Sequence, residues 1–116
     1  MQTRQEVEFT LVLPAIRRGV SLELKRLGMK QAEVARRLQL TKAAVTQYVK
    51  GIRGSNIQID EVTKKEITNA AINIQKEADA REEIQKILNS IKERRVVCKY
   101  HRLHNKELGK CDICFN

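Results

Sequence analysis

Tryptophan is absent from this sequence, and two Phe and two Tyr are its only aromatic residues. Because proteins bind single-stranded nucleic acids largely by stacking bases on aromatic rings, this composition favours duplex over single-strand binding. The sequence also lacks the roughly 18 consecutive apolar residues that a membrane-spanning helix requires. The first ten residues, MQTRQEVEFT, contain no apolar core of a signal peptide, so we expect a cytoplasmic protein.

Residue patterns that support catalysis are missing as well. We find no Ser-His-Asp arrangement, no glycine-rich phosphate-binding loop and no pair of carboxylates on one predicted helix face. The two histidines, His101 and His104, lie among cysteines rather than beside a nucleophile. We therefore expect a protein that is not an enzyme and that has no small-molecule substrate.

Acidic residues are too few to balance the basic ones: 14 Asp and Glu stand against 23 Lys and Arg, a formal net charge of +9. The excess is concentrated in residues 1–58, where eleven basic and four acidic residues give a net charge of +7. Residues 59–95 carry eight of each sign. Because neutralised phosphates release counterions, a basic surface favours a polyanionic partner, although such a surface can also serve solubility alone.

The first helical signals surround the single proline. With 116 residues, the chain has the length of one domain, or of one compact domain plus a tail. Pro14 suits the first turn of a helix, and Gly28 suits its end. The residues before Pro14 alternate between apolar and polar, which fits either a short strand or a helical turn kinked at Pro14. Between Pro14 and Gly28 the apolar stripe with helical spacing consists of Ile16, Val20, Leu24 and Leu27.

Two short helical patterns follow, about Gln31–Leu38 and Thr41–Lys50, with two residues between them. Thr41 is placed to cap the second helix with its hydroxyl, and Gly51 is placed to end it. A helix-turn-helix needs five apolar positions and one small residue, so that its two helices can lock together. The sequence meets all six requirements with Val34, Leu38, Leu40, Val45, Tyr48 and the small Ala35.

Residues 11–54 resemble the XRE-type (lambda-repressor-like) helix-turn-helix of predicted archaeal transcriptional regulators. The stretches that carry the resemblance are LPAIR, QAEVARRL, AVTQYVKG and the closing RG. One position departs from the pattern, because Gln39 stands where the turn usually has a glycine with positive φ; we expect a cost of about 1 kcal/mol. The prediction is an all-α fold with a lambda-repressor-like helix-turn-helix bundle over 1–58, amphipathic helices over 59–95 and a Cys/His-rich tail over 96–116.

The resemblance implies that the helix Thr41–Lys50 enters the major groove of duplex DNA. Base contacts are then expected from Gln47 to adenine, from Lys42 to guanine and from Ala43 to a thymine methyl group. Phosphate contacts are expected from basic side chains around the two helices and from the helix N-terminus at Gln31. The alternative for each of these side chains is a solvated surface position. The complete predicted DNA-binding set is Lys30, Gln31, Arg37, Thr41, Lys42, Ala43, Thr46, Gln47, Lys50 and Arg53.

Residues 60–95 form an amphipathic helical pattern that a minimal helix-turn-helix does not need. Asp60 is placed to cap one helix, and Asp79, with Glu82 three residues later, marks a second helix start or a bend. We predict that this segment supports a homodimer, which would bring two recognition helices to successive major grooves. The alternative is a monomer whose long helices only complete the core. The apolar positions are Ile67, Ala70, Ala71, Ile74, Ile84, Ile87, Leu88 and Ile91.

Cysteine and histidine gather near the C-terminus in the stretch CKYHRLHNKELGKCDIC. The spacing C-x2-H, nine residues, C-x2-C suits tetrahedral zinc, because each pair chelates the ion and the loop brings the pairs together. We predict a zinc site at Cys98, His101, Cys111 and Cys114, with His104 as an alternative to His101. An iron–sulfur cluster, a Cys111–Cys114 dithiol switch and ordinary reduced cysteines are the other interpretations. The regulators that the chain resembles often end in a cysteine cluster, which favours a metal or redox role.

Taken together, these patterns predict a homodimeric transcriptional regulator that binds double-stranded DNA sequence-specifically and carries a metal-binding tail. No membrane partner is expected. A second hypothesis is an antitoxin-like or architectural module that uses the same fold for protein contacts. That module would show sequence-independent DNA affinity, or none without its protein partner.

Overall fold

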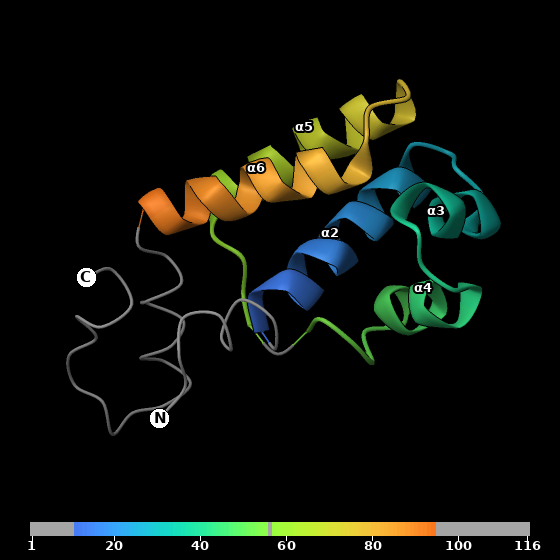
Figure 1. Ribbon diagram of the computed structural model, residues 1–116. Coiled ribbons are helices and arrows are strands. Elements are labelled where there is room, and N and C mark those ends of the chain that lie inside the picture. Colours follow the sequence, from blue (N-terminus) through green and yellow to red (C-terminus); the bar gives the residue numbers. More distant parts are fainter. Residues whose placement is uncertain (1–10, 56, 95–116) are drawn as a thin grey trace.

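A computed structural model describes residues 11–55 and 57–94 of the chain. In this part of the chain every regular element is a helix, and no strand occurs, so the predicted all-α class is confirmed. Figure 1 shows α3 and α4 on one side of α2, with α5 and α6 side by side across another. The helices are α2 (Leu13–Arg26), α3 (Gln31–Leu38), α4 (Lys42–Val49), α5 (Glu61–Gln75) and α6 (Ala80–Glu93). None of these helices combines the length and the apolar character needed to cross a membrane.

Both ends of α2 lie where the sequence signals place them. Leu11 and Val12 have helical backbone and are buried, so for these two residues the helical alternative before Pro14 is confirmed. Pro14 lies in the first turn, where helical amides have no carbonyl partner within the helix. At the other end Gly28 has a φ of 97°, a left-handed conformation that glycine adopts without steric cost.

α2 is the central helix, and it packs against each of the other four helices of the described part. Ile16, Val20 and Leu24 are fully buried along the predicted stripe. Their neighbours in the core come from every other helix, so the two halves of the predicted helical region share one hydrophobic core. These neighbours are Val34, Ala35, Leu38, Val45, Ile67, Ala70, Ala71, Ile74, Ala80, Ile87 and Ile91.

α5 and α6 form a hairpin that packs across α2 (Figure 1). Asp60 is the residue before α5, and the Asp60 carboxylate accepts a hydrogen bond from the Thr63 hydroxyl. Asp79 starts α6, because its carboxylate accepts from the backbone amides of Arg81 at 2.8 Å and Glu82 at 3.2 Å. Of the two alternatives for Asp79, a new helix start is therefore found. All the predicted apolar positions of both helices are buried or partly buried.

The far end of the hairpin is closed by Arg94, the residue that follows α6. Its guanidinium donates to Asp60 at 3.0 Å, to Thr63 at 3.1 Å and to Glu66 at 2.6 Å. Arg94 thus ties the end of α6 to the start of α5. Near the other end of the hairpin, the Asn73 carboxamide of α5 donates to the Glu83 carboxylate of α6 at 2.8 Å.

The outer face of the hairpin is poor in exposed apolar side chains. Among the described residues, the large hydrophobic side chains that are exposed are Ile52, at 71%, and Val62, at 51%. Only Val62 belongs to the hairpin, and most of the hairpin's other large apolar side chains pack in the shared core: Ile67, Ile74, Ile84, Ile87, Leu88 and Ile91. The hairpin therefore completes the core, and the described residues present no broad apolar face on it for a second copy. The homodimer stays a prediction.

Candidate nucleic-acid interface

The turn between α3 and α4 is left-handed at Gln39, which has φ 56° and ψ 43°. The amide of Leu40 donates a hydrogen bond to the carbonyl of Ala35 at 2.9 Å, and the amide of Gln39 donates to the carbonyl of Arg36 at 3.2 Å. This bonding satisfies carbonyl groups that the end of α3 would otherwise leave without partners. The positive φ expected for this position is thus confirmed, although a glutamine rather than a glycine adopts it.

α4 has a defined start and a defined end. The Thr41 hydroxyl oxygen accepts from the backbone amide of Ala44 at 3.0 Å, the predicted N-cap. At the other end Gly51 has a φ of 76°, and its amide donates to the carbonyl of Tyr48 at 3.1 Å. Both caps depend on local residue type, so the length of this short helix follows directly from the sequence.

The packing of α4 determines which of its side chains face solvent. Val45 and Tyr48 are buried, and α4 contacts both α2 and α3. With these two side chains pointing inward, Lys42, Ala43 and Gln47 face solvent. Thr46 is half-buried. The fully exposed members of the predicted set on and beside α4 are Thr41, Lys42, Ala43, Gln47, Lys50 and Arg53.

The charged residues that flank and form α4 in the sequence are all basic. No Asp or Glu occurs between Glu33 and Asp60, whereas five Lys and Arg do. The side chains of Lys42 and Lys50 form no ion pair with another described residue. Arg53 lies over the ring of Tyr48, 5.6 Å from its centroid, a cation–π contact that holds the guanidinium beside the end of α4. The acid-free stretch is a sequence signal that a charge count over residues 1–58 does not reveal.

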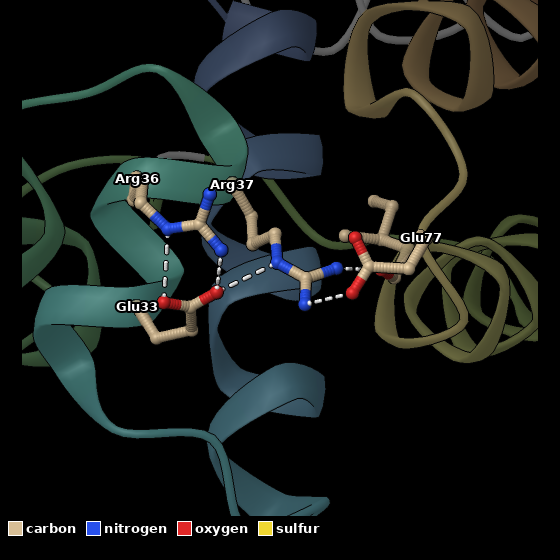
Figure 2. A network of polar contacts seen from close by, with 5 residues as sticks. Glu33, Arg36, Arg37 and Glu77 are labelled. Atoms are coloured by element: carbon tan, nitrogen blue, oxygen red, sulfur yellow. Dashed lines mark hydrogen bonds and ion pairs between the residues drawn. The ribbon is translucent and has the colours of Figure 1, made fainter.

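Arg37 belongs to the predicted DNA-binding set, but the structure directs it into the molecule (Figure 2). Its three nitrogens donate to Glu33 at 2.7 Å, to the carbonyl of Ile74 at 2.6 Å and to Glu77 at 2.8 Å. Hydrogen bonds from Arg36 and then from Arg37 lower the pKa of Glu33 to about 2. The Arg37 side chain is only 16% exposed and is directed at Glu33, Ile74 and Glu77, so we propose that it holds the helices together rather than contacts DNA. Two of these acceptors lie far along the sequence, where helical spacing does not reveal them.

Gln31 and Thr46, both in the predicted set, are bonded to each other. The Gln31 Nε2 atom donates to the Thr46 hydroxyl oxygen at 2.6 Å, and that hydroxyl donates to the carbonyl of Lys42 at 3.0 Å. Lys25, at the end of α2, donates to the Gln31 Oε1 atom at 3.4 Å. Sequence reasoning missed Lys25, because its link to Gln31 crosses the turn between α2 and α3. Three helices therefore meet at Gln31.

The predicted metal ligands cannot be compared with this geometry, since they lie outside the described residues. Within 11–55 and 57–94, no group of three or more His, Cys, Asp or Glu is arranged to hold a metal ion. The metal site therefore stays a prediction. The residues concerned are Cys98, His101, Cys111 and Cys114, with His104 as the alternative ligand.

Comparison of the chain with protein families, with curated proteins and with solved structures finds no match. The XRE-type resemblance therefore stays a prediction. The functional inference depends on the chain's own residues, chiefly the outward face of α4 and the contacts that hold this helix in place.

Proposed function

We propose that the chain is a transcriptional regulator that binds duplex DNA sequence-specifically, with α4 as its recognition helix. The outward face of α4 carries this proposal, because Lys42, Ala43 and Gln47 are exposed together on a helix fixed by Thr41 and Gly51. The major groove admits an α-helix, and the basic side chains on and beside α4 are attracted to the phosphates on either side of it. A helix held at both ends can present these side chains in one fixed geometry.

The exposed face of α4 offers three different chemistries to base edges. The Gln47 carboxamide can pair with adenine through a donor and an acceptor, and the Lys42 ammonium can donate to guanine. The Ala43 methyl group suits the methyl group of thymine. Because these three groups prefer different base pairs, the face supports sequence discrimination in addition to general DNA affinity.

Side chains at the edges of this face are suited to phosphate. Lys30 and Gln31 lie at the N-terminus of α3, where the helix dipole and free amides favour an anion. Lys50 and Arg53 lie at the C-terminal end of α4, and the Arg53 guanidinium is held by the Tyr48 ring. Phosphate contacts from the start of α3 and from the end of α4 would fix the orientation of α4 in the groove without adding sequence information.

A site-selection experiment tests the proposal. The full chain and two variants, Gln47→Ala and Arg53→Ala, are each used to select duplexes from a random library. Gln47→Ala should relax the preference at one base position by about 1–3 kcal/mol, and Arg53→Ala should weaken binding to all sequences alike. Arg81→Ala, which removes an exposed positive charge from α6, is the matched control and should change neither the base preference nor the overall affinity. Uniform weakening by both Gln47→Ala and Arg53→Ala would contradict the assignment of α4 to base recognition.

Two copies of the chain, we propose, occupy neighbouring half-sites. Successive major grooves on one side of a duplex lie about 34 Å apart, so a pair of recognition helices reads a two-fold symmetric site. Sedimentation of the full chain with the selected duplex should give two chains per duplex. A complex that saturates at one chain per duplex would contradict the homodimer.

For residues 96–116 we propose a metal site that uses Cys98, His101, Cys111 and Cys114. Thiolate and imidazole are the donors that structural zinc prefers, and three thiolates also suit an iron–sulfur cluster. Elemental analysis of protein purified without oxygen distinguishes the two, since zinc leaves the sample colourless and iron with sulfide gives a broad brown absorption. Replacing Cys111 and Cys114 by Ser should abolish metal binding, and stoichiometric metal in that double variant would contradict the site.

A further inference from the structure

The Thr46 hydroxyl makes two hydrogen bonds inside the protein. Its single hydrogen is donated to the carbonyl of Lys42 at 3.0 Å, and its oxygen accepts from Gln31 at 2.6 Å. The side chain is half-buried, whereas Ala43 and Gln47 on either side of it are exposed. The hydroxyl therefore has no hydrogen left for an acceptor on a base edge, and it lies closer to the protein than its neighbours do.

The Gln31 side chain, in contrast, keeps a free donor. A carboxamide has two N–H groups, of which Thr46 accepts one, while the Gln31 Oε1 atom accepts from Lys25 at 3.4 Å. Lys25 is exposed, and its ammonium has two further hydrogens. No side chain caps the N-terminus of α3, because Lys30 at the N-cap position accepts no hydrogen bond from the first turn.

The free donors thus point to one kind of ligand. The second N–H of Gln31, the ammonium of Lys25 and the open end of α3 are gathered at the same corner of the interface. Their charge and donor capacity match a phosphate group, which offers several anionic oxygen atoms at once. The hydrogen bond to Thr46 connects this corner to the middle of α4.

We infer that Thr46 is a positioning residue: it contacts no base, but holds Gln31 so that Gln31 and Lys25 together bind one backbone phosphate. This inference rests on the proposed function, because it takes α4 as the helix that enters the groove. The consequence is a fixed distance between that phosphate and α4, which sets how deep α4 lies in the groove. Thr46 therefore leaves the set of DNA-contacting residues, and Lys25 joins the phosphate-binding residues.

Two nearly isosteric replacements separate this role from base reading. Thr46→Val keeps both branches of the side chain and loses the hydroxyl, and Thr46→Ser keeps the hydroxyl and loses the methyl group. Thr46→Val should bind every duplex about 3- to 10-fold more weakly with unchanged base preference, the usual effect of one lost hydrogen bond. Thr46→Ser should bind like the wild type. A changed preference at one base position in either variant, or full affinity in Thr46→Val, would overturn the inference.

Coupling to Gln31 gives a second, quantitative readout. Because the two side chains act as one unit, the Gln31→Ala/Thr46→Val double variant should bind no more weakly than Gln31→Ala alone. Fully additive losses would contradict a shared role. Lys25→Gln should lower the dependence of log affinity on log salt concentration by about one, the loss of one phosphate contact. Lys86→Gln on α6 is the matched control and should leave the salt dependence unchanged.

The free protein provides a readout that needs no DNA. In ¹H–¹⁵N spectra, the Gln31 side-chain amide should shift and exchange faster with solvent in Thr46→Val, and should be unchanged in Thr46→Ser. An unchanged amide signal in Thr46→Val would overturn the bond itself. A wild-type chain that binds no duplex selectively would defeat the proposed function and this inference with it. A selective wild type whose preference changes at one base position in Thr46→Val would defeat the inference alone.

Discussion

The Arg37 guanidinium in α3 donates a hydrogen bond of 2.6 Å to the carbonyl oxygen of Ile74 near the end of α5. A second nitrogen of the same guanidinium donates a hydrogen bond of 2.8 Å to the carboxylate of Glu77, in the turn after α5. Glu77 has a φ of 77°, which is uncommon for a residue with a side chain. α3 is therefore attached to the α5–α6 turn through one arginine (Figure 2), in addition to the apolar core.

Arg37→Ala should lower the stability of the whole described helical unit. The Arg37 side chain is 16% exposed, and its removal leaves the Ile74 carbonyl and two carboxylates without this donor. Arg36→Ala is the matched control on the same turn, because the Arg36 side chain is 67% exposed and its guanidinium is hydrogen-bonded to Glu33, within the same helix. The urea concentration at the midpoint of unfolding should be clearly lower for Arg37→Ala than for Arg36→Ala. Equal midpoints would show that the long-range contacts of Arg37 contribute nothing.

The contribution of Glu33 to stability should depend on pH. The bonds from Arg36 and Arg37 lower the Glu33 pKa from 4.5 to about 2, so the folded state binds a proton less readily than the unfolded state. The resulting stabilisation is complete above pH 4.5 and is lost as the pH falls toward about 2. Urea unfolding of wild type and Glu33→Gln should differ most near neutral pH and converge in acid. A difference that is constant with pH would contradict the lowered pKa.

Gln39→Gly should stabilise the fold by about 0.5–1 kcal/mol. Gln39 has a φ of 56°. This conformation is unfavourable for residues with a Cβ atom and nearly free of strain for glycine. Gly28→Ala is the reverse control: its φ is 97° and nothing lies within 4 Å of the added Cβ, so only the backbone is strained. That variant should lose about 1 kcal/mol. Thermal or urea unfolding measures the stability of both variants. A Gln39→Gly variant less stable than the wild type would contradict the strain at this turn.

Thr41→Ala should destabilise α4 by about 1 kcal/mol, because the amide of Ala44 loses its acceptor. Thr41→Ser keeps an oxygen at this position and should retain most of the stability. The two variants are compared by amide hydrogen exchange of the first turn of α4. Equal protection in both would mean that the Thr41 cap does not hold the start of this helix.

Local sequence signals account for most of the helix boundaries. Pro14, Gly28, Thr41, Gly51 and Asp79 act on the backbone within a few residues of themselves, so each predicts a helix end without knowledge of the fold. The apolar spacing predicts the buried face of each helix for the same reason. The all-α class follows from these signals alone.

Contacts between distant side chains account for what the sequence does not reveal. The sequence does not distinguish Arg37 from a solvent-exposed arginine, because its partners Ile74 and Glu77 lie about forty residues away. The pairing of Gln31 with Thr46 likewise depends on how α3 crosses α4. Helical periodicity shows which residues face outward from their own helix, but not which of them meet another helix.

The most direct test is the affinity of the full wild-type chain for duplex DNA. A duplex enriched from a random library is compared with a scrambled duplex of the same composition at several salt concentrations. We predict at least about 10³-fold tighter binding to the enriched duplex, with log affinity falling linearly as log salt concentration rises. Equal affinity for the two duplexes, or failure of any duplex to be enriched, would contradict sequence-specific recognition by α4.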